Sequence, residues 1–123
     1  MTDTTTLGAR FATALAAKDF DRLRGLLHPE IDFRGMTPNR FWEASDPDTV
    51  VVDILQRWFE PSDEIESLDG LDSEPVADRE RVGYRFSVRN PDGHFVVEQQ
   101  AYVNARDGKI DWMRVMCSGF RPS

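Results

Sequence analysis

The sequence predicts one α+β domain in which helices pack on one face of a sheet. Two observations support this prediction. Helical patterns dominate the first half of the chain, where they enclose one pair of short strands, and strand patterns separated by hairpin turns fill the second half. This order is typical of α+β folds, in which helices gather on one side of an antiparallel sheet. A length of 123 residues corresponds to a single domain over residues 1–123.

Two helices and a strand pair are expected first. In LGARFATALAAK, residues 7–18, apolar side chains recur at helical spacing among strong helix formers. A shorter helix follows Asp19, a good N-cap, and Pro29 prevents its continuation. The segments EIDFRG at 30–35 and NRFWEA at 39–44 then predict two strands joined by turn residues.

The clearest helix is DPDTVVVDILQRWFEP, residues 46–61. Asp46 is a good N-cap, Pro47 suits the first helical position, and Pro61 ends the helix. Its apolar face follows the i, i+3, i+4, i+7, i+8 pattern: Val51, Ile54, Leu55, Trp58 and Phe59.

The rest of the chain predicts a meander of three or four antiparallel strands. DEIESL at 63–68 continues irregularly towards residues 74–77, and RVGYRFSV at 81–88 alternates cleanly. The turns NPDG and RDGK are strong hairpin signals, and they connect this strand to FVVEQQAYV at 95–103 and then to IDWMRVMC at 110–117.

Composition narrows the possible partners and location. The net charge of −7 argues against nucleic acid and anionic membrane surfaces, because both need a basic patch. No apolar run approaches the roughly 20 residues of a membrane span, and the N-terminus does not look like a secretory signal. The single cysteine, Cys117, fits a reducing compartment. We therefore expect a cytoplasmic protein without nucleic-acid or membrane partners. No cluster with metal-ligand spacing and no phosphate loop is present, so we expect neither a metal nor a cofactor.

The strand FVVEQQAYV has polar residues in its middle. Side chains alternate across a strand, which gives one face Glu98, Gln100 and Tyr102 and the other Phe95, Val97, Gln99, Ala101 and Val103. A buried carboxylate or amide needs a partner or a functional role.

Residues 10–35, RFATALAAKDFDRLRGLLHPEIDFRG, and 107–115, DGKIDWMRV, resemble the nuclear transport factor two-like superfamily. That group includes ketosteroid isomerase, limonene epoxide hydrolase and the SnoaL-like polyketide cyclases. The resemblance covers nearly the whole chain. It implies a cystatin-like α+β roll, in which a curved antiparallel sheet wraps round the N-terminal helices and a cone-shaped pocket, often in a homodimer. It also implies that the face of Gln100 looks into the pocket.

The resemblance shows that known catalytic residues are replaced. Phe11 stands where ketosteroid isomerase has a tyrosine, Gly35 where it has its base, and Gln100 near its late aspartate. The late Trp-Arg-Asp of limonene epoxide hydrolase falls on residues 113–115, Met-Arg-Val. Of the isomerase positions, the third alone keeps a hydrogen-bonding group.

The predicted catalytic residues are Glu98, Gln100 and Tyr102. A carboxylate in an apolar pocket can act as general acid or base, whereas a buried ion pair with Arg34 or Arg40 is the structural alternative. Gln100 and Tyr102 would orient a carbonyl or hydroxyl group. The predicted substrate-binding residues are Phe11, Trp42, Trp58, Tyr84, Phe86 and Met113.

Two functions are compatible with these residues. The first is a cofactor-independent isomerase, cyclase, dehydratase or epoxide hydrolase that acts on a small apolar, carbonyl-bearing compound. The alternative is a non-catalytic domain that binds a ligand or a protein. Cys117 is expected to do no chemistry, because neither histidine reads as its base and a buried cysteine behaves as a small apolar residue.

The other face of the strand at 95–103 is expected to form a homodimer interface. If the face of Gln100 points inward, a row of apolar residues points outward: Phe95, Val97, Ala101, Val103, Ile110, Trp112 and Met116. Large exposed apolar patches are uncommon on monomers, and a two-fold axis would cover this one with its own copy.

Overall fold

The computed structural model of the chain describes residues 6–123. Its helical segments are α1 (Leu7–Ala16), α2 (Phe20–Leu26), the π-helical η1 (Thr49–Leu55) and α3 (Gln56–Trp58). Its strands are β1 (Leu27–Thr37), β2 (Arg40–Ala44), β3 (Glu64–Val76), β4 (Arg79–Asn90), β5 (Gly93–Arg106), β6 (Lys109–Cys117) and β7 (Arg121–Pro122).

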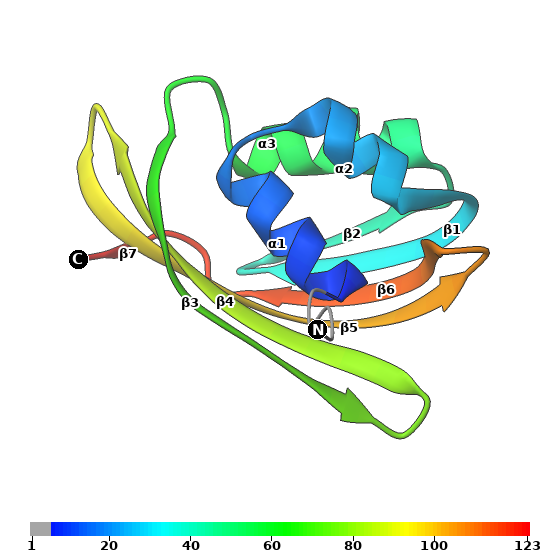
Figure 1. Cartoon of the computed structure of the whole chain (residues 1–123). Helices are drawn as coiled ribbons and strands as arrows, with labels where there is room; N and C mark the ends of the chain where they lie inside the picture. Colours follow the sequence, from blue (N-terminus) through cyan, green and yellow to red (C-terminus); the bar gives the residue numbers. More distant parts are fainter. Residues whose placement is uncertain (1–5) are drawn as a thin grey trace.

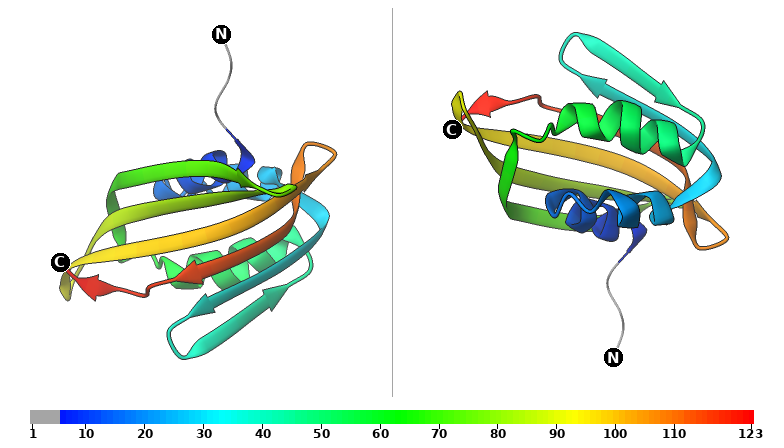
Figure 2. Two further views of the ribbon diagram at one scale, coloured as in Figure 1. Left: turned by 90° about the horizontal axis from the view of Figure 1, so that it is seen from below. Right: turned by 90° about the horizontal axis from the view of Figure 1, so that it is seen from above.

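The helices cover one face of a curved, open sheet (Figure 1). The strand order is β2-β1-β6-β5-β4-β3, and β7 pairs with the beginning of β5. Seen from above, the α1–α2 pair and the η1–α3 segment lie over this same face (Figure 2). The predicted α+β class is confirmed. One pair of neighbouring strands, β1 and β6, is parallel, whereas the other pairs in this order are antiparallel.

The N-terminal helices begin where the sequence predicts. The Oδ1 of Asp19 accepts a hydrogen bond from the backbone N–H of Arg22 at 3.1 Å, which caps α2. At the start of α1, the carboxylate of Glu80 on β4 accepts from the hydroxyl of Thr6 and from the N–H of Gly8. A Cβ on Gly8 would lie 2.6 Å from an oxygen of Glu80, so this contact requires glycine. The helix is therefore held against the sheet at its first turn.

The predicted helix at 46–61 is present, but most of it is π-helical. Asp46 begins it as expected, because its Oδ1 accepts from the N–H of Thr49 at 2.8 Å. The whole predicted apolar face is buried: Val51, Ile54, Leu55, Trp58 and Phe59. The π-helical turns of η1 are the feature that apolar spacing did not predict.

The inward face of β5 is the opposite of the predicted one. Gln99 lies directly opposite Tyr84 in the β4–β5 register, and paired residues of antiparallel strands share a face. Tyr84 points to the core, and the side chain of Gln99 therefore points to the core as well. The side chains of Val97, Gln99, Ala101 and Val103 are buried. Glu98, Gln100 and Tyr102 consequently lie on the outer face of the sheet.

This reversal also changes the predicted outer surface. Val97, Ala101, Val103 and Ile110 belong to the core, so their assignment to a dimer interface is wrong. Phe95 is half-buried and contacts Phe120, with ring centroids 5.7 Å apart. Trp112 and Met116 do lie on the outer face, in register with Asn104 and Gln100.

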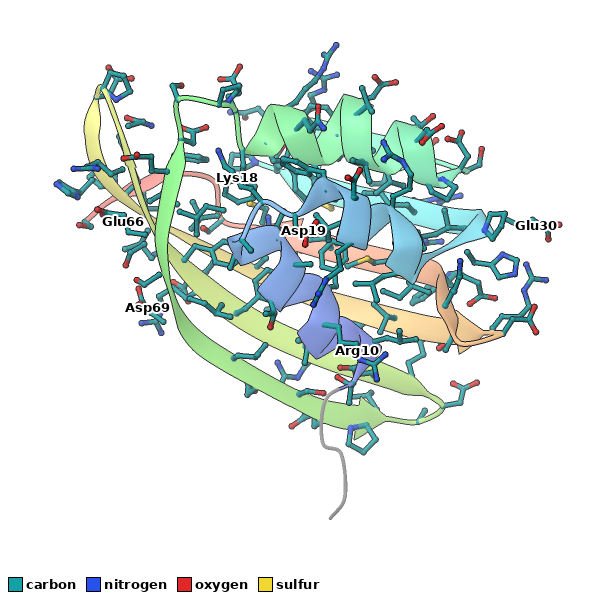
Figure 3. The ribbon with its side chains drawn as sticks, turned by 45° about the horizontal axis from the view of Figure 1, so that its top comes forward. Arg10, Lys18, Asp19, Glu30, Glu66 and Asp69 are labelled. Atoms are coloured by element: carbon teal, nitrogen blue, oxygen red, sulfur yellow. The ribbon has the colours of Figure 1, made fainter. Side chains whose placement is uncertain are left out.

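A polar cluster that the sequence did not reveal joins the loop after α3 to its neighbours. Lys18, labelled at the end of α1 in Figure 3, donates to the carbonyl oxygen of Glu60 at 2.6 Å and to that of Asp63. The buried carboxylate of Asp63 accepts from the N–H of Glu60 and from the amide of Asn90, each at 2.9 Å. Burial lowers the pKa of Lys18. These contacts connect α1, the loop and the β4–β5 hairpin.

Candidate functional site

A buried polar pair lies on the inner face of the sheet. The hydroxyl of Tyr84 donates to the Oε1 of Gln99 at 2.6 Å. The two residues are 4% and 1% exposed, respectively, so water does not reach either side chain freely. Apolar residues surround the pair, among them Phe86, whose ring centroid lies 5.3 Å from that of Tyr84. The hydrogen bond therefore fixes the orientation of the Gln99 amide inside an apolar core.

The amide nitrogen of Gln99 has no hydrogen-bond partner among residues 6–123. Because Oε1 is turned towards Tyr84, Nε2 is held in the opposite direction. An unsatisfied buried donor costs about 1–3 kcal/mol, and folded proteins leave few of them. The Gln99 amide thus keeps one buried donor that no described residue satisfies.

Tyr84 acts in this pair as a fixed donor. Burial raises the pKa of Tyr84 far above its ordinary value, and a negative charge on Cys117 would raise it further. The phenol therefore stays protonated across the physiological range and does not serve as a base.

Cys117 completes the row of Tyr84 and Gln99 across the sheet. It lies opposite Gln99 in the β5–β6 register, and its free thiol is buried. Its Sγ accepts a hydrogen bond from the N–H of Gly119 at 3.4 Å. The two histidines lie beside carboxylates instead, His28 near Asp107 and His94 near Glu66. The geometry assigns no base to the thiol.

We expect Cys117→Ser to leave ligand binding intact and to lower the free energy of unfolding by about 1 kcal/mol or less, because the residue packs as a small apolar group. Urea denaturation measures the stability. Alkylation of the native protein by iodoacetamide at neutral pH should be slow, with the urea-unfolded protein as the fast control. Rapid alkylation of the native thiol would contradict the prediction.

A second buried donor without a partner belongs to Trp58. Its side chain is 7% exposed, and its Nε1 finds no acceptor in the part of the chain that the structure describes. The ring lies on the backbone of Gly35, where an added Cβ would be 2.9 Å from the ring. The neighbouring Trp42, with its ring centroid 6.1 Å away, donates to the hydroxyl of Thr37 at 2.8 Å.

The predicted substrate-binding residues all face the interior. Five are buried in the core and Trp42 packs against it: Phe11, Trp42, Trp58, Tyr84, Phe86 and Met113. They contact one another and the helices as core residues do. Whether they also contact a substrate stays a prediction.

The predicted catalytic residues lie instead along two grooves of the outer face. Glu98 and Gln100 line a groove of about 520 Å³ together with two arginines, Arg85 and Arg121. Gln100 and Tyr102 line a more apolar groove of about 510 Å³. The side chain of Glu98 is 45% exposed, so the burial that its acid–base role presupposed is absent.

Glu98 pairs with arginines, but not with those that the sequence suggested. The Nε of Arg85 lies 3.7 Å from its carboxylate, and Arg121 donates to the other oxygen. Arg34 lies near Asp32 and Glu43 instead, and Arg40 stacks on Trp42.

Within residues 6–123, no three or more His, Cys, Asp or Glu side chains are grouped so that they could hold a metal ion. None of the helices described is both long enough and apolar enough to cross a membrane.

Comparison with known proteins places the fold. No family model and no curated protein matches the chain. A candidate isomerase from Rhodopseudomonas palustris is 17% identical with a TM-score of 0.71, covering 95% of this chain and 93% of its own. An NTF2-like protein from Burkholderia thailandensis is 18% identical with a TM-score of 0.70, covering 96% and 92%. An epoxide hydrolase from M. tuberculosis, of the LEH-like type, is 14% identical with a TM-score of 0.64, covering 89% and 77%. The chain therefore has the nuclear transport factor 2-like (NTF2-like) fold.

Proposed function

We propose that the protein binds a small, largely apolar molecule between the helices and the sheet, with an oxygen of that molecule accepting from Nε2 of Gln99. The observation that carries this proposal is the buried amide of Gln99, which Tyr84 orients and whose nitrogen has no acceptor among residues 6–123. A ligand oxygen would remove the cost of the unsatisfied donor. Solved structures of the same fold include a candidate isomerase and an epoxide hydrolase.

The surroundings of Gln99 indicate a neutral ligand with a carbonyl group. Its neighbours on the inner face, Val97, Ala101, Tyr84 and Cys117, carry no formal charge that would pair with an ionised ligand. A fixed N–H donor in an apolar site favours a carbonyl oxygen. Turnover would need a proton acceptor as well, and the protonated Tyr84 is not one. The interior geometry thus supports ligand binding more than it supports catalysis.

A matched pair of ligands tests the proposal. Acetylnaphthalene carries a carbonyl that ethylnaphthalene lacks, and the two have nearly the same shape. The wild-type protein should bind the ketone about ten-fold more tightly, as one buried hydrogen bond predicts. Gln99→Leu should abolish this preference, as measured by isothermal titration calorimetry.

Gln100→Leu is the control, because it makes the same change one residue away on the outer face. It should keep the preference for the ketone. Equal affinities of the wild-type protein for the two compounds, or loss of the preference in both variants, would contradict a site at Gln99.

A second candidate function is acid–base catalysis on the outer face, of the isomerase, cyclase, dehydratase or epoxide-hydrolase type. The observation that favours it is that Glu98 and Gln100 line one groove, beside which Tyr102 continues the row. Glu98 would have to be released from Arg85 and Arg121 to accept a proton. In that case Glu98→Gln would abolish turnover without changing ligand binding in the interior.

We also propose a homodimer that forms through the outer face of the sheet. Four exposed residues form an apolar surface there, which we call the outer apolar surface: Met36, Phe41, Tyr102 and Met116. They replace most of the residues predicted from the alternation of β5. A second copy related by a two-fold axis would bury this surface against itself.

A cytoplasmic location without nucleic-acid or membrane partners completes the proposal. Its support is the net charge of −7 and the free thiol of Cys117, which suits a reducing compartment. Localisation of a fluorescent fusion in the source organism would test it.

A further inference from the structure

We propose that Trp58 determines specificity at the interior site by donating its indole N–H to a second oxygen at the far end of the ligand. This inference rests on the function proposed above. Trp58 Nε1 and Gln99 Nε2 are both buried donors without partners among the described residues, and both belong to the inner layer. Trp42 shows that the neighbourhood can satisfy an indole, since its N–H reaches Thr37.

The two donors lie at opposite ends of a row of small side chains. Gly35, Val115 and Ala101 are aligned across β1, β6 and β5, and all three are buried on the inner face. Trp58 stands over Gly35 at one end, and Gln99 precedes Ala101 by two residues on β5 at the other. Two strand spacings, about 10 Å, separate the backbones of β1 and β5. The Trp58 ring packs on Gly35, and the side chains of Val115 and Ala101 lie between it and the strand of Gln99.

The backbone that carries Trp58 is also unusual. It follows directly on η1, a π-helix of seven residues. π-Helical turns are rare and occur often at functional sites. The ring of Trp58 contacts that of Phe33, at a centroid distance of 6.2 Å, and that of Trp42. These contacts orient the ring, and no residue in the described part of the chain accepts from its N–H.

The ligand class follows from these donors. Two neutral N–H groups over strands that are two spacings apart match a neutral, flat ring compound that bears an acceptor oxygen at each end, such as a ketone with a distant ether or carbonyl. A carboxylate would be a poor match, because the donors bring no compensating charge into the apolar interior.

Three naphthalene compounds test this inference: ethylnaphthalene, acetylnaphthalene, and acetylnaphthalene with a methoxy group at the opposite end of its long axis. In the wild-type protein, the methoxy group should improve affinity about five-fold, as one further hydrogen bond predicts. Trp58→Phe keeps an aromatic ring but removes the N–H, and it should abolish this gain, so that the two ketones bind the variant with equal affinity. Trp112→Phe on the outer face is the control and should keep the gain.

The outcomes separate the two proposals. If the wild-type protein prefers the ketone to ethylnaphthalene but gains nothing from the methoxy group, the role of Trp58 is overturned and the Gln99 site stands. Equal weakening of both ketones by Trp58→Phe shows a packing role only and overturns the inference as well. If the wild-type protein does not prefer acetylnaphthalene to ethylnaphthalene, the proposed function itself is overturned.

A measurement on the wild-type protein covers the case in which Trp58→Phe does not fold. The indole N–H resonance of Trp58 in an NMR spectrum should move downfield on addition of the methoxy ketone and much less on addition of acetylnaphthalene. The same shift with both compounds would overturn the inference.

Discussion

Met116→Glu should convert the protein from a particle of twice the chain mass of 14.1 kDa to a single chain. Met116 is 58% exposed and lies in the outer apolar surface. Near a two-fold axis, each new carboxylate would be buried against apolar side chains or against its own copy. Burying an unpaired charge costs several kcal/mol, which exceeds what a modest interface supplies. Light scattering at tens of micromolar protein measures the mass.

Met116 is a better position for this test than Trp112. The ring of Trp112 lies between two guanidinium groups, with Arg79 at 4.2 Å and Arg114 at 4.4 Å from its centroid. Trp112 is thus already paired with cations and lies outside the outer apolar surface, so it tests that surface less directly. Val52→Glu is the matched control, because Val52 is 47% exposed on η1, on the helical side. It should leave the mass unchanged. A wild-type monomer at high micromolar concentration would exclude the proposed dimer.

Tyr84→Phe should lower the free energy of unfolding by about 1–3 kcal/mol, because it leaves both polar atoms of the buried Gln99 amide without partners. Gln99→Leu should also be destabilising, since the Tyr84 hydroxyl then loses its acceptor. The double variant should be close to the wild-type protein or more stable, because no unsatisfied polar group of the pair remains. Urea denaturation at one protein concentration measures the free energy of unfolding of the wild type, the two single variants and the double variant.

Tyr102→Phe is the control for the cycle. It removes the same hydroxyl from a residue that is 38% exposed on the outer face. Its effect should stay within about 0.5 kcal/mol, as for most surface substitutions. If the effects of Tyr84→Phe and Gln99→Leu simply add, the two side chains are not coupled and the orientation of the amide needs another cause.

Local patterns determined the elements of this fold. Apolar spacing predicted α1, α2 and the helix after Asp46, and turn residues predicted the hairpins around β5. Such signals work because a helix or hairpin is specified by residues close together in the sequence. The resemblance of two segments added the curved roll, and the structure confirms it.

The inward face of β5 could also have been derived from the sequence, by counting from the turn. The NPDG loop pairs Asn90 with Gly93, and continuing this register places Tyr84 opposite Gln99. An inward Tyr84 then requires an inward Gln99. Alternation within one strand distinguishes its two faces but does not say which one is buried. The resemblance, applied to Gln100, selected the wrong face.

Other features depended on contacts between distant segments. Three contacts join residues that lie far apart in the chain. They are the parallel pairing of β1 with β6, the hydrogen bond from Asn90 to Asp63, and the packing of Trp58 on Gly35. No local sequence pattern predicts these contacts, because each depends on how whole elements pack. For the same reason the unsatisfied N–H groups of Gln99 and Trp58 become visible only in the folded chain: whether a buried donor has an acceptor depends on every neighbour that the fold brings to it.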